Sequence, residues 1–344
     1  MRFSLRDLLI VVTVVCILFA LLIPVMQAAR EAARRMSCNN NFKQLGLAIH
    51  NYHSAFKQCP AAMFGTASNQ FRLNGLIAIA PFMEVTPYWD TISNPQTYGG
   101  VPYPAMGPVP WDSRYRPWRQ SSPTVRCPSD LKLVQPSRCA NYAFCVGDQV
   151  LGLYDSQTDD EMRGMFAPRR YLRFQDVLDG MSNTIMMTEI GTARDRQIRG
   201  QFAIGGSATL ADSPAECLAL IDPLKPSSFA SDAALSKVGR GGAYAEGSGG
   251  YSLVNTILPP NAPSCAIGNR PPFEGVFSAG SYHPGGCHLL LGDGAVVFIT
   301  DTVHAGSASR PSPRDNGTLT GRGRWSPYGL WGALGTRASG EPAS

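Results

Sequence analysis

The longest apolar run of the chain lies close to its N-terminus and predicts a helix that could cross a membrane. Residues 8–26 read LLIVVTVVCILFALLIPVM and carry no charged side chain. At about 1.5 Å per residue, a helix of this length matches the roughly 30 Å hydrocarbon core of a bilayer. A cleaved signal peptide would instead need an apolar run of roughly 7–15 residues and a small-residue cleavage site. The pattern therefore favours a retained anchor, with a signal peptide as the alternative.

The same helix is expected to continue beyond the apolar run. Residues 27–57 are rich in Ala, Arg, Gln and Leu, which all tolerate a helix. Apolar side chains recur there at steps of three and four, which places them on one helix face. They are Phe42, Leu45, Ile49, Tyr52 and Phe56. The pattern predicts one long helix whose first half lies in lipid and whose second half packs against a soluble domain.

Apolar positions alternate with period two in the second half of the chain, which is typical of strands. We expect strands over 184–190, 287–291 and 295–299, with a shorter candidate over 199–204. Gly292-Asp293-Gly294 separates two of them and supplies a turn with positive φ. These patterns predict an α+β fold in which the long helix packs on an antiparallel sheet, with long irregular insertions.

The remaining segments are predicted to be short elements and loops. A short helix is expected over 73–84, a Pro-, Gly- and aromatic-rich surface loop over 98–123, and an insertion or lid over 155–170. Ser326 and Pro327 suggest the start of a short terminal helix with Leu330, Trp331 and Leu334 facing inward. The expected organisation is a short N-terminus (1–7), a transmembrane helix (8–26), its extension (27–57), a β-rich domain (58–304) and a flexible tail (305–344).

Composition narrows the class of protein. The chain has 344 residues, of which 44% are hydrophobic and 16% charged, enough apolar content for a sizeable core. Its formal net charge is only +5, and it has no long basic run. A nucleic-acid partner therefore has little support.

Nine cysteines raise the question of disulfides or metal. Cys16 lies in the apolar run, and no pair shows the C-x-x-C spacing of a zinc or redox site, which argues against metal ligation. Thiols outside the cytosol favour disulfides. We expect Cys38–Cys59 and one pair within Cys127, Cys139 and Cys145; the alternative is that several cysteines are simply small buried side chains.

Candidate catalytic and metal residues are few. His283, His288 and Asp293 could be combined into a metal or catalytic group, but on a strand and turn their side chains need not converge, and a hydrogen-bonded His is the commoner arrangement. Glu189 ends a predicted strand, and a structural role is favoured over that of a catalytic acid. The chain lacks the G-x-S-x-G, H-E-x-x-H and P-loop motifs. We therefore expect no enzyme activity, no cofactor and no metal.

The segment FSLRDLLIVVTVVCILFALLIPVMQAAREAARRMSCNNNFKQLGLAIHNYH resembles the N-terminus of type IV pilins and type II secretion pseudopilins. It is most similar to pilin-like proteins of planctomycete bacteria, which join a prepilin-type cleavage and methylation segment to a domain of unknown function. The resemblance implies that Phe3 is the first residue after leader removal, that Asp7 matches the buried Glu of pilins and that Pro24 matches their helix-kinking Pro. Arg2 departs from the pattern because pilins carry Gly there, so either the prepilin peptidase accepts Arg or the leader stays.

A second stretch resembles the same family. His283 is followed by nine residues and then by Asp293-Gly294, as in the planctomycete proteins. Together the two stretches imply a membrane-anchored, pilin-like structural protein of the cell envelope, with the membrane and other pilin-like subunits as partners. Its N-terminus would be cytoplasmic and its main domain extracytoplasmic. The alternative is a single-pass envelope protein that does not polymerise and binds a glycan or protein.

Overall fold

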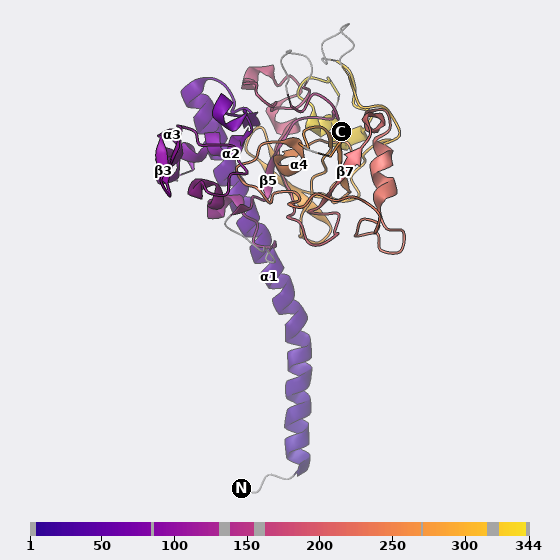
Figure 1. Ribbon diagram of the computed structural model, residues 1–344. Helices are drawn as coiled ribbons and strands as arrows, with labels where there is room; N and C mark the ends of the chain where they lie inside the picture. The colour runs from indigo at the N-terminus through magenta and orange to yellow at the C-terminus, as the bar shows by residue number, and fades with distance from the viewer. Residues whose placement is uncertain are drawn as a thin grey trace.

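A long N-terminal helix and an α+β domain with several small sheets make up the protein (Figure 1). The computed structural model describes residues 5–83, 86–130, 138–154, 162–269, 271–314 and 323–341. Helix α1 (Leu5–Phe56) projects from the domain as one continuous rod, with the N-terminus of the chain at its far end. The single long helix predicted from the sequence is confirmed, and Pro24 lies inside it.

The first half of α1 is exposed along its described residues. Its large apolar side chains between Leu5 and Met26 are 41% to 74% exposed. The most apolar 18-residue window of the helix has a mean hydropathy of 3.2, and none of it is buried. A helix of this length and composition could span a membrane, and a signal sequence would meet the same criteria.

The second half of α1 is packed by the domain. Phe42, Leu45 and Ile49 are fully buried, and the Phe42 ring meets the edge of the Tyr142 ring with 4.6 Å between centroids. The predicted apolar face is therefore correct as far as Tyr52. Phe56 does not follow the prediction: it is the last residue of the helix and is 55% exposed, because burial of the helix ends before its last turn.

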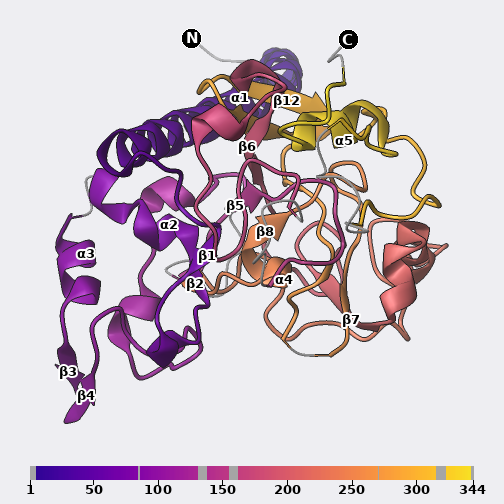
Figure 2. The same cartoon turned by 90° about the horizontal axis from the view of Figure 1, so that it is seen from above.

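A five-stranded sheet packs beside α1 (Figure 2). Its strand order is β12 (Val296–Thr300), β11 (Gly286–Leu291), β6 (Ile185–Glu189), β5 (Tyr142–Cys145) and β8 (Leu253–Val254). The three strands predicted from period two are β6, β11 and β12, and they pair antiparallel as expected. The complete sheet is mixed, because β8 pairs parallel with β5. All five residues of β6 are buried. The period-two pattern of this strand therefore does not separate a buried face from a solvent-exposed face.

Smaller sheets and short helices fill the rest of the described chain. The small sheets pair β1 (Met63–Phe64) with β2 (Leu73–Asn74), β3 (Gln96–Tyr98) with β4 (Val101–Tyr103), and order β10 (Gly275–Val276), β9 (Ser264–Ile267) and β7 (Phe202–Gly206). The short α-helices are α2 (Gly75–Ala78), α3 (Thr86–Ser93), α4 (Gly249–Ser252) and α5 (Gly329–Gly335). Single 3₁₀ turns lie at 67–69, 80–82, 116–119, 123–125, 174–176, 181–183 and 208–211, with a longer one at 214–220. Residues 98–123 are less exposed than predicted, because Tyr115 and Trp118 are buried.

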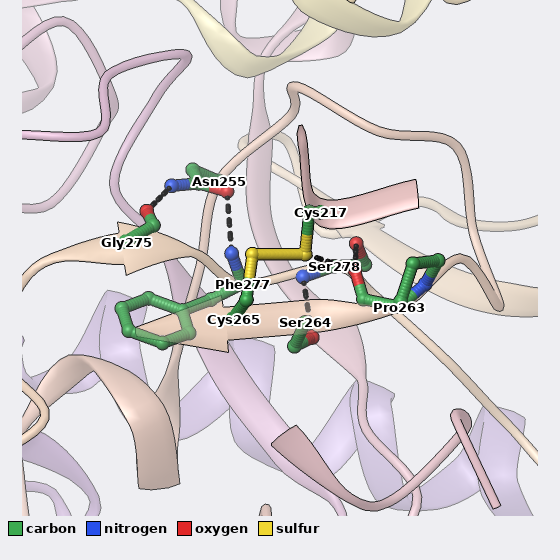
Figure 3. Close-up of a disulfide and its surroundings, with 8 residues drawn as sticks. All are labelled: Cys217, Asn255, Pro263, Ser264, Cys265, Gly275, Phe277 and Ser278. Atoms are coloured by element: carbon green, nitrogen blue, oxygen red, sulfur yellow. Dashed lines mark hydrogen bonds between the residues drawn. A yellow bond between two sulfur atoms is a disulfide. The ribbon is translucent and has the colours of Figure 1, made fainter. Parts of the chain in front are cut away.

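One disulfide joins Cys217 to Cys265, which lies on β9 (Figure 3). Around it, the Asn255 amide donates to the carbonyl of Gly275 at 2.8 Å and accepts from the N–H of Phe277 at 2.9 Å. The sequence did not single out this pair.

Both predicted disulfides are wrong. Neither Cys38–Cys59 nor any pair within Cys127, Cys139 and Cys145 is bonded. Cys38 and Cys127 instead lie against a histidine side chain.

The C-terminal segment is docked on the domain. Helix α5 begins at Gly329, two residues later than the predicted first position Pro327, and Trp331 on it is fully buried while Leu330 and Leu334 are half-buried. Of the predicted flexible tail, residues 315–322 and 342–344 lie outside the described residues, as do residues 155–161 of the predicted lid. Ser312 is buried and accepts a hydrogen bond from the N–H of Val150 at 2.9 Å.

The β11–β12 hairpin turn rests on α1. Lys43 Nζ donates to the carbonyl of Gly294 at 2.7 Å, and His50 Nε2 lies 3.0 Å from the carbonyl of Gly292. Gly294 has φ of 83°, so the predicted positive-φ turn is confirmed. The His283 imidazole, which begins the same family pattern, does not pin this turn, because it faces Cys38, Cys127 and Glu31.

Gly294→Val is expected to lower the free energy of unfolding by about 1–3 kcal/mol, because a β-branched side chain disfavours positive φ. A Cβ at this position would meet nothing within 4 Å, so backbone strain alone accounts for the loss. Denaturant unfolding of the full chain in detergent measures it. Ala295→Val adds bulk next to the turn and is the control. Equal unfolding midpoints for the two variants would contradict the strain argument.

Candidate functional site

Four side chains from distant parts of the chain meet where α1 enters the domain. Cys38 is on α1, Cys127 follows the 3₁₀ turn Pro123–Val125, Glu189 ends β6, and His283 precedes β11. One nitrogen, oxygen or sulfur atom from each lies within 4.8 Å of all the others. All four residues are buried. Cysteine, histidine and carboxylate side chains are the ligands that zinc prefers.

The four groups converge on the Nε2 atom of His283. This nitrogen lies 3.3 Å from Cys38 Sγ, 3.4 Å from Cys127 Sγ and 3.4 Å from Glu189 Oε1. A ring nitrogen can donate or accept only one hydrogen bond at a time, so it cannot satisfy its three neighbours together. Among the described residues, Glu189 Oε1 has no hydrogen-bond partner although it is buried.

The opposite ring nitrogen of His283 is held by a carboxylate. Nδ1 lies 2.5 Å from Glu31 Oε1 and 3.1 Å from Ser129 Oγ. Glu31 precedes Cys38 by seven residues, two turns along α1, so both project from the same helix face. Arg34 donates to Glu31 Oε2 at 2.8 Å and fixes the carboxylate in turn. These contacts orient the imidazole so that Nε2 faces the thiols.

Glu189 is held through its second oxygen. Oε2 accepts the backbone N–H of His288 at 2.8 Å and lies 3.2 Å from Nδ1 of the same residue. These contacts leave Oε1 directed at His283. His288 therefore positions the carboxylate and is not one of the four groups that converge.

Cys127 belongs to a turn anchored by a buried polar network. The Asn141 side-chain oxygen accepts the N–H of Cys127 at 2.9 Å, and Asn141 Nδ2 donates to Asp130 at 2.7 Å. Asp130 also accepts from Thr192 Oγ1 and Arg194 Nη2, both at 2.7 Å. The sequence Cys-Pro-Ser-Asp thus forms a rigid turn that presents the Cys127 sulfur to His283.

The buried Glu189 carboxylate favours a positive charge beside it in the cluster. Burial by itself raises the pKa of the Glu189 carboxyl, but the neighbouring His283 and His288 rings outweigh it and hold the pKa at about 2. Burial lowers the pKa of His283, whereas its contacts with Cys127 and Glu189 raise that pKa to about 10. A hydrogen bond with Cys38 and burial both raise the pKa of the Cys127 thiol. A carboxylate therefore remains charged inside the domain and must be balanced there.

The structure brings together only part of the histidine and acid group considered from the sequence. His283 and His288 both contact Glu189, with 5.1 Å between the two ring centroids. Asp293 is separate: it lies at the hairpin turn, where its Oδ1 accepts the N–H of Ala295 at 2.8 Å. Cys38 and Cys127 lie far apart in the chain, so the lack of a C-x-x-C spacing does not reveal that both meet His283.

The residues expected from the sequence to act in processing and assembly are Arg2, Phe3, Asp7 and Pro24. Arg2 and Phe3 lie outside the described residues, and so does the side chain of Asp7. Pro24 lies within α1.

A separate cavity of about 970 Å³ opens elsewhere on the domain. Its lining includes Arg72, Trp111, Gln201, Glu246 and Tyr251. Arg72 pairs with Glu246 at 2.9 Å, and its guanidinium lies 4.4 Å from the centroid of the Trp111 ring. The cavity offers an aromatic ring beside charged hydrogen-bonding groups.

Comparison with known proteins places the domain in a family. The sequence pattern of a family described as proteins of unknown function (DUF1559) matches residues 27–306. The chain belongs to this family. The family region begins directly after the apolar half of α1 and includes Cys38, Cys127, Glu189 and His283. No curated protein and no solved structure matches the chain. The domain of unknown function implied by the sequence resemblance is therefore confirmed, while the likeness to pilins stays a prediction.

Proposed function

We propose that this member of the family is a membrane-anchored, pilin-like or pseudopilin-like structural subunit of the bacterial cell envelope, without enzyme activity. The observation that carries the proposal is the division of α1 into an exposed apolar half and a buried half within one continuous helix. Such a helix fixes the domain to a bilayer and also presents an apolar surface to neighbouring helices. The proposed orientation has a cytoplasmic N-terminus and an extracytoplasmic domain.

Charge along α1 is consistent with an anchor that ends near Met26. The next charged residues are Arg30, Glu31, Arg34 and Arg35, and the first fully buried side chain is Cys38. Arginines at this level can reach the headgroup layer while the helix remains intact. The apolar half therefore fits the hydrocarbon core, and the charged turns fit its boundary.

Apolar side chains alone do not drive helices together in a membrane, because they pack against lipid tails as well as against another helix. Asp7 is the acid at the start of the apolar run, and an acid at such a position usually has a partner. After leader removal, the amine of Phe3 on a neighbouring copy would be that partner. Pairing between subunits would neutralise both charges and set the stagger of a fibre.

Asp7→Ala is expected to leave membrane insertion and folding intact and to abolish crosslinked multimers in membranes, because the neighbouring amine loses its carboxylate. Asp7→Glu keeps the charge and is the matched control, so it should give the wild-type ladder. Determination of the mature N-terminus belongs to the same experiment, since Phe3 supports processing and Met1 a plain anchor. Equal ladders for wild type and Asp7→Ala, or none in either, would contradict the assembly role.

The cavity supports a second candidate function. Under this proposal the protein is a single-pass envelope protein that does not polymerise and binds a glycan. Ligand pockets combine apolar or aromatic walls with a few fixed polar groups, as Trp111, Arg72 and Glu246 do here. Quenching of Trp111 fluorescence by soluble glycan fragments, absent in Trp111→Ala, would favour it. No change in fluorescence would count against it.

A further inference from the structure

We propose that Cys38, Cys127, Glu189 and His283 form a tetrahedral Zn²⁺ site that clamps α1 to the domain. The proposal rests on the convergence of four buried ligand groups from four separate segments. It is independent of whether the protein assembles through its apolar helix. The site differs from the group suggested by the sequence, because it excludes Asp293 and includes two cysteines.

The spacing of the ligand atoms fits a zinc ion. Zinc binds sulfur at about 2.3 Å and nitrogen or oxygen at about 2.0–2.2 Å in tetrahedral sites. A tetrahedral angle then separates sulfur from nitrogen by roughly 3.5 Å and nitrogen from oxygen by roughly 3.4 Å. The distances from His283 Nε2 are 3.3 Å and 3.4 Å to the two sulfurs and 3.4 Å to Glu189 Oε1. These three distances match the tetrahedral values within a few tenths of an ångström, and all four ligand atoms lie within 4.8 Å of one another.

Two polar atoms of the cluster, Glu189 Oε1 and His283 Nε2, lack the partners that an ion would supply. Glu189 Oε1 is buried and has no hydrogen-bond partner within the described chain, and burying such an atom is costly. His283 Nε2 can serve only one of its three neighbours by hydrogen bonding. A divalent cation at the centre binds the carboxylate oxygen, the ring nitrogen and both sulfurs together.

The surrounding contacts are those of a metal centre. Metal-binding histidines usually donate their second nitrogen to a carboxylate or carbonyl, which fixes the ring. Glu31 Oε1 lies 2.5 Å from His283 Nδ1 and can accept that proton. His288 orients Glu189, and Asn141 orients the Cys127 turn. Three of the four ligands are thus held in place by other residues.

The ligand set indicates a structural role and zinc as the metal. Four protein ligands complete a tetrahedral ion and leave no position for water, as in structural zinc sites. Two sulfurs exclude magnesium and calcium, which prefer oxygen ligands. Since Cys38 is on α1 and the other ligands belong to the domain, the ion would hold the helix at the point where it leaves the domain.

The first experiment uses the full-length protein, reduced and purified in detergent. After removal of metal with a chelator, Co²⁺ is added and the visible spectrum is recorded. We expect one Co²⁺ per chain, with the intense visible bands of a tetrahedral site and a sulfur-to-cobalt charge-transfer band, both lost on addition of Zn²⁺. No such spectrum, and no bound Zn²⁺ by elemental analysis, would overturn the proposal without any mutation. A Cys38–Cys127 disulfide in protein purified without reductant would also overturn it.

Variants then assign the ligands. Cys127→Ser and His283→Gln should each weaken Co²⁺ binding at least tenfold. Cys59→Ser removes a buried thiol outside the cluster and should bind like wild type. Circular dichroism checks that each variant is folded. Folded Cys127→Ser and His283→Gln proteins that bind Co²⁺ with wild-type affinity would overturn the assignment.

A second readout tests the clamp on the wild-type protein alone. If the ion holds α1, its removal should let the helix detach locally, so trypsin should cut after Arg34 or Arg35 at least tenfold faster. Restored Zn²⁺ should return the cleavage rate to its original value. Equal rates with and without Zn²⁺, in protein shown to bind it, would overturn the clamp.

Discussion

Asp130→Ala is expected to lower the free energy of unfolding by about 3–5 kcal/mol, because it leaves a buried cation and several donors without their acceptor. The carboxylate accepts from Asn141, Thr192 and Arg194 at distances of 2.7–2.9 Å. It is 2% exposed, and Arg194 is 19% exposed. The turn that carries Cys127 depends on the same network, so the loss extends to the cluster. Denaturant unfolding of the full chain in detergent gives the value.

The chain contains a matched control for this prediction. Asp112 pairs with Arg114 at 2.8 Å, nearly the distance between Asp130 and Arg194, but Arg114 is 71% exposed. Water can replace an exposed partner and screens the attraction, so Asp112→Ala should leave the unfolding midpoint unchanged. Similar shifts for the two variants would show that burial of the Asp130 network does not matter.

Trp331→Ala should destabilise the protein to a similar extent, by about 3–5 kcal/mol, because it removes a large buried aromatic side chain and leaves a cavity. The indole is fully buried, and its Nε1 donates to the carbonyl of Leu258 at 2.8 Å. It packs in a cluster with residues of β5, β6 and β11. The prediction matters because Trp331 lies beyond residue 306, where the family region ends.

Trp325→Ala is the control for size and chemistry, since Trp325 is 66% exposed. It should shift the unfolding midpoint far less than Trp331→Ala. If both variants unfold like wild type, helix α5 is an appendage and the domain ends with the family region. A large loss only for Trp331→Ala makes the C-terminal segment part of the fold.

The elements that the sequence predicts well are those defined by local periodicity. Helix α1 follows from a long apolar run and a repeat of three and four, and the β11–β12 hairpin from period two around Gly294. Both patterns lie within one continuous segment. The prediction failed at Phe56, because nothing in the repeat shows where the domain stops covering the helix.

The candidate site could be predicted only in part, because its members are distant in the chain. Glu31 and His283 are separated by 252 residues, and Cys38 and His283 by 245. A search for adjacent cysteines rejects metal binding for this reason, although the fold places two thiols at one imidazole. The Cys217–Cys265 disulfide was missed similarly, since the two residues are 48 positions apart and no spacing rule selects them.

Because α1 is continuous, the segment between Met26 and Cys38 fixes the height and the rotation of the domain relative to the apolar run. Twelve helical residues hold the first clamped position about 18 Å above the end of the apolar run, and each residue adds roughly 100° of rotation about the axis. One inserted residue would turn the whole domain to face a different neighbour while raising it by only about 1.5 Å. Under the proposed assembly, the length of this short stretch, whose side chains up to Ser37 are exposed or half-buried, would set which surface of the domain meets the next molecule in the membrane.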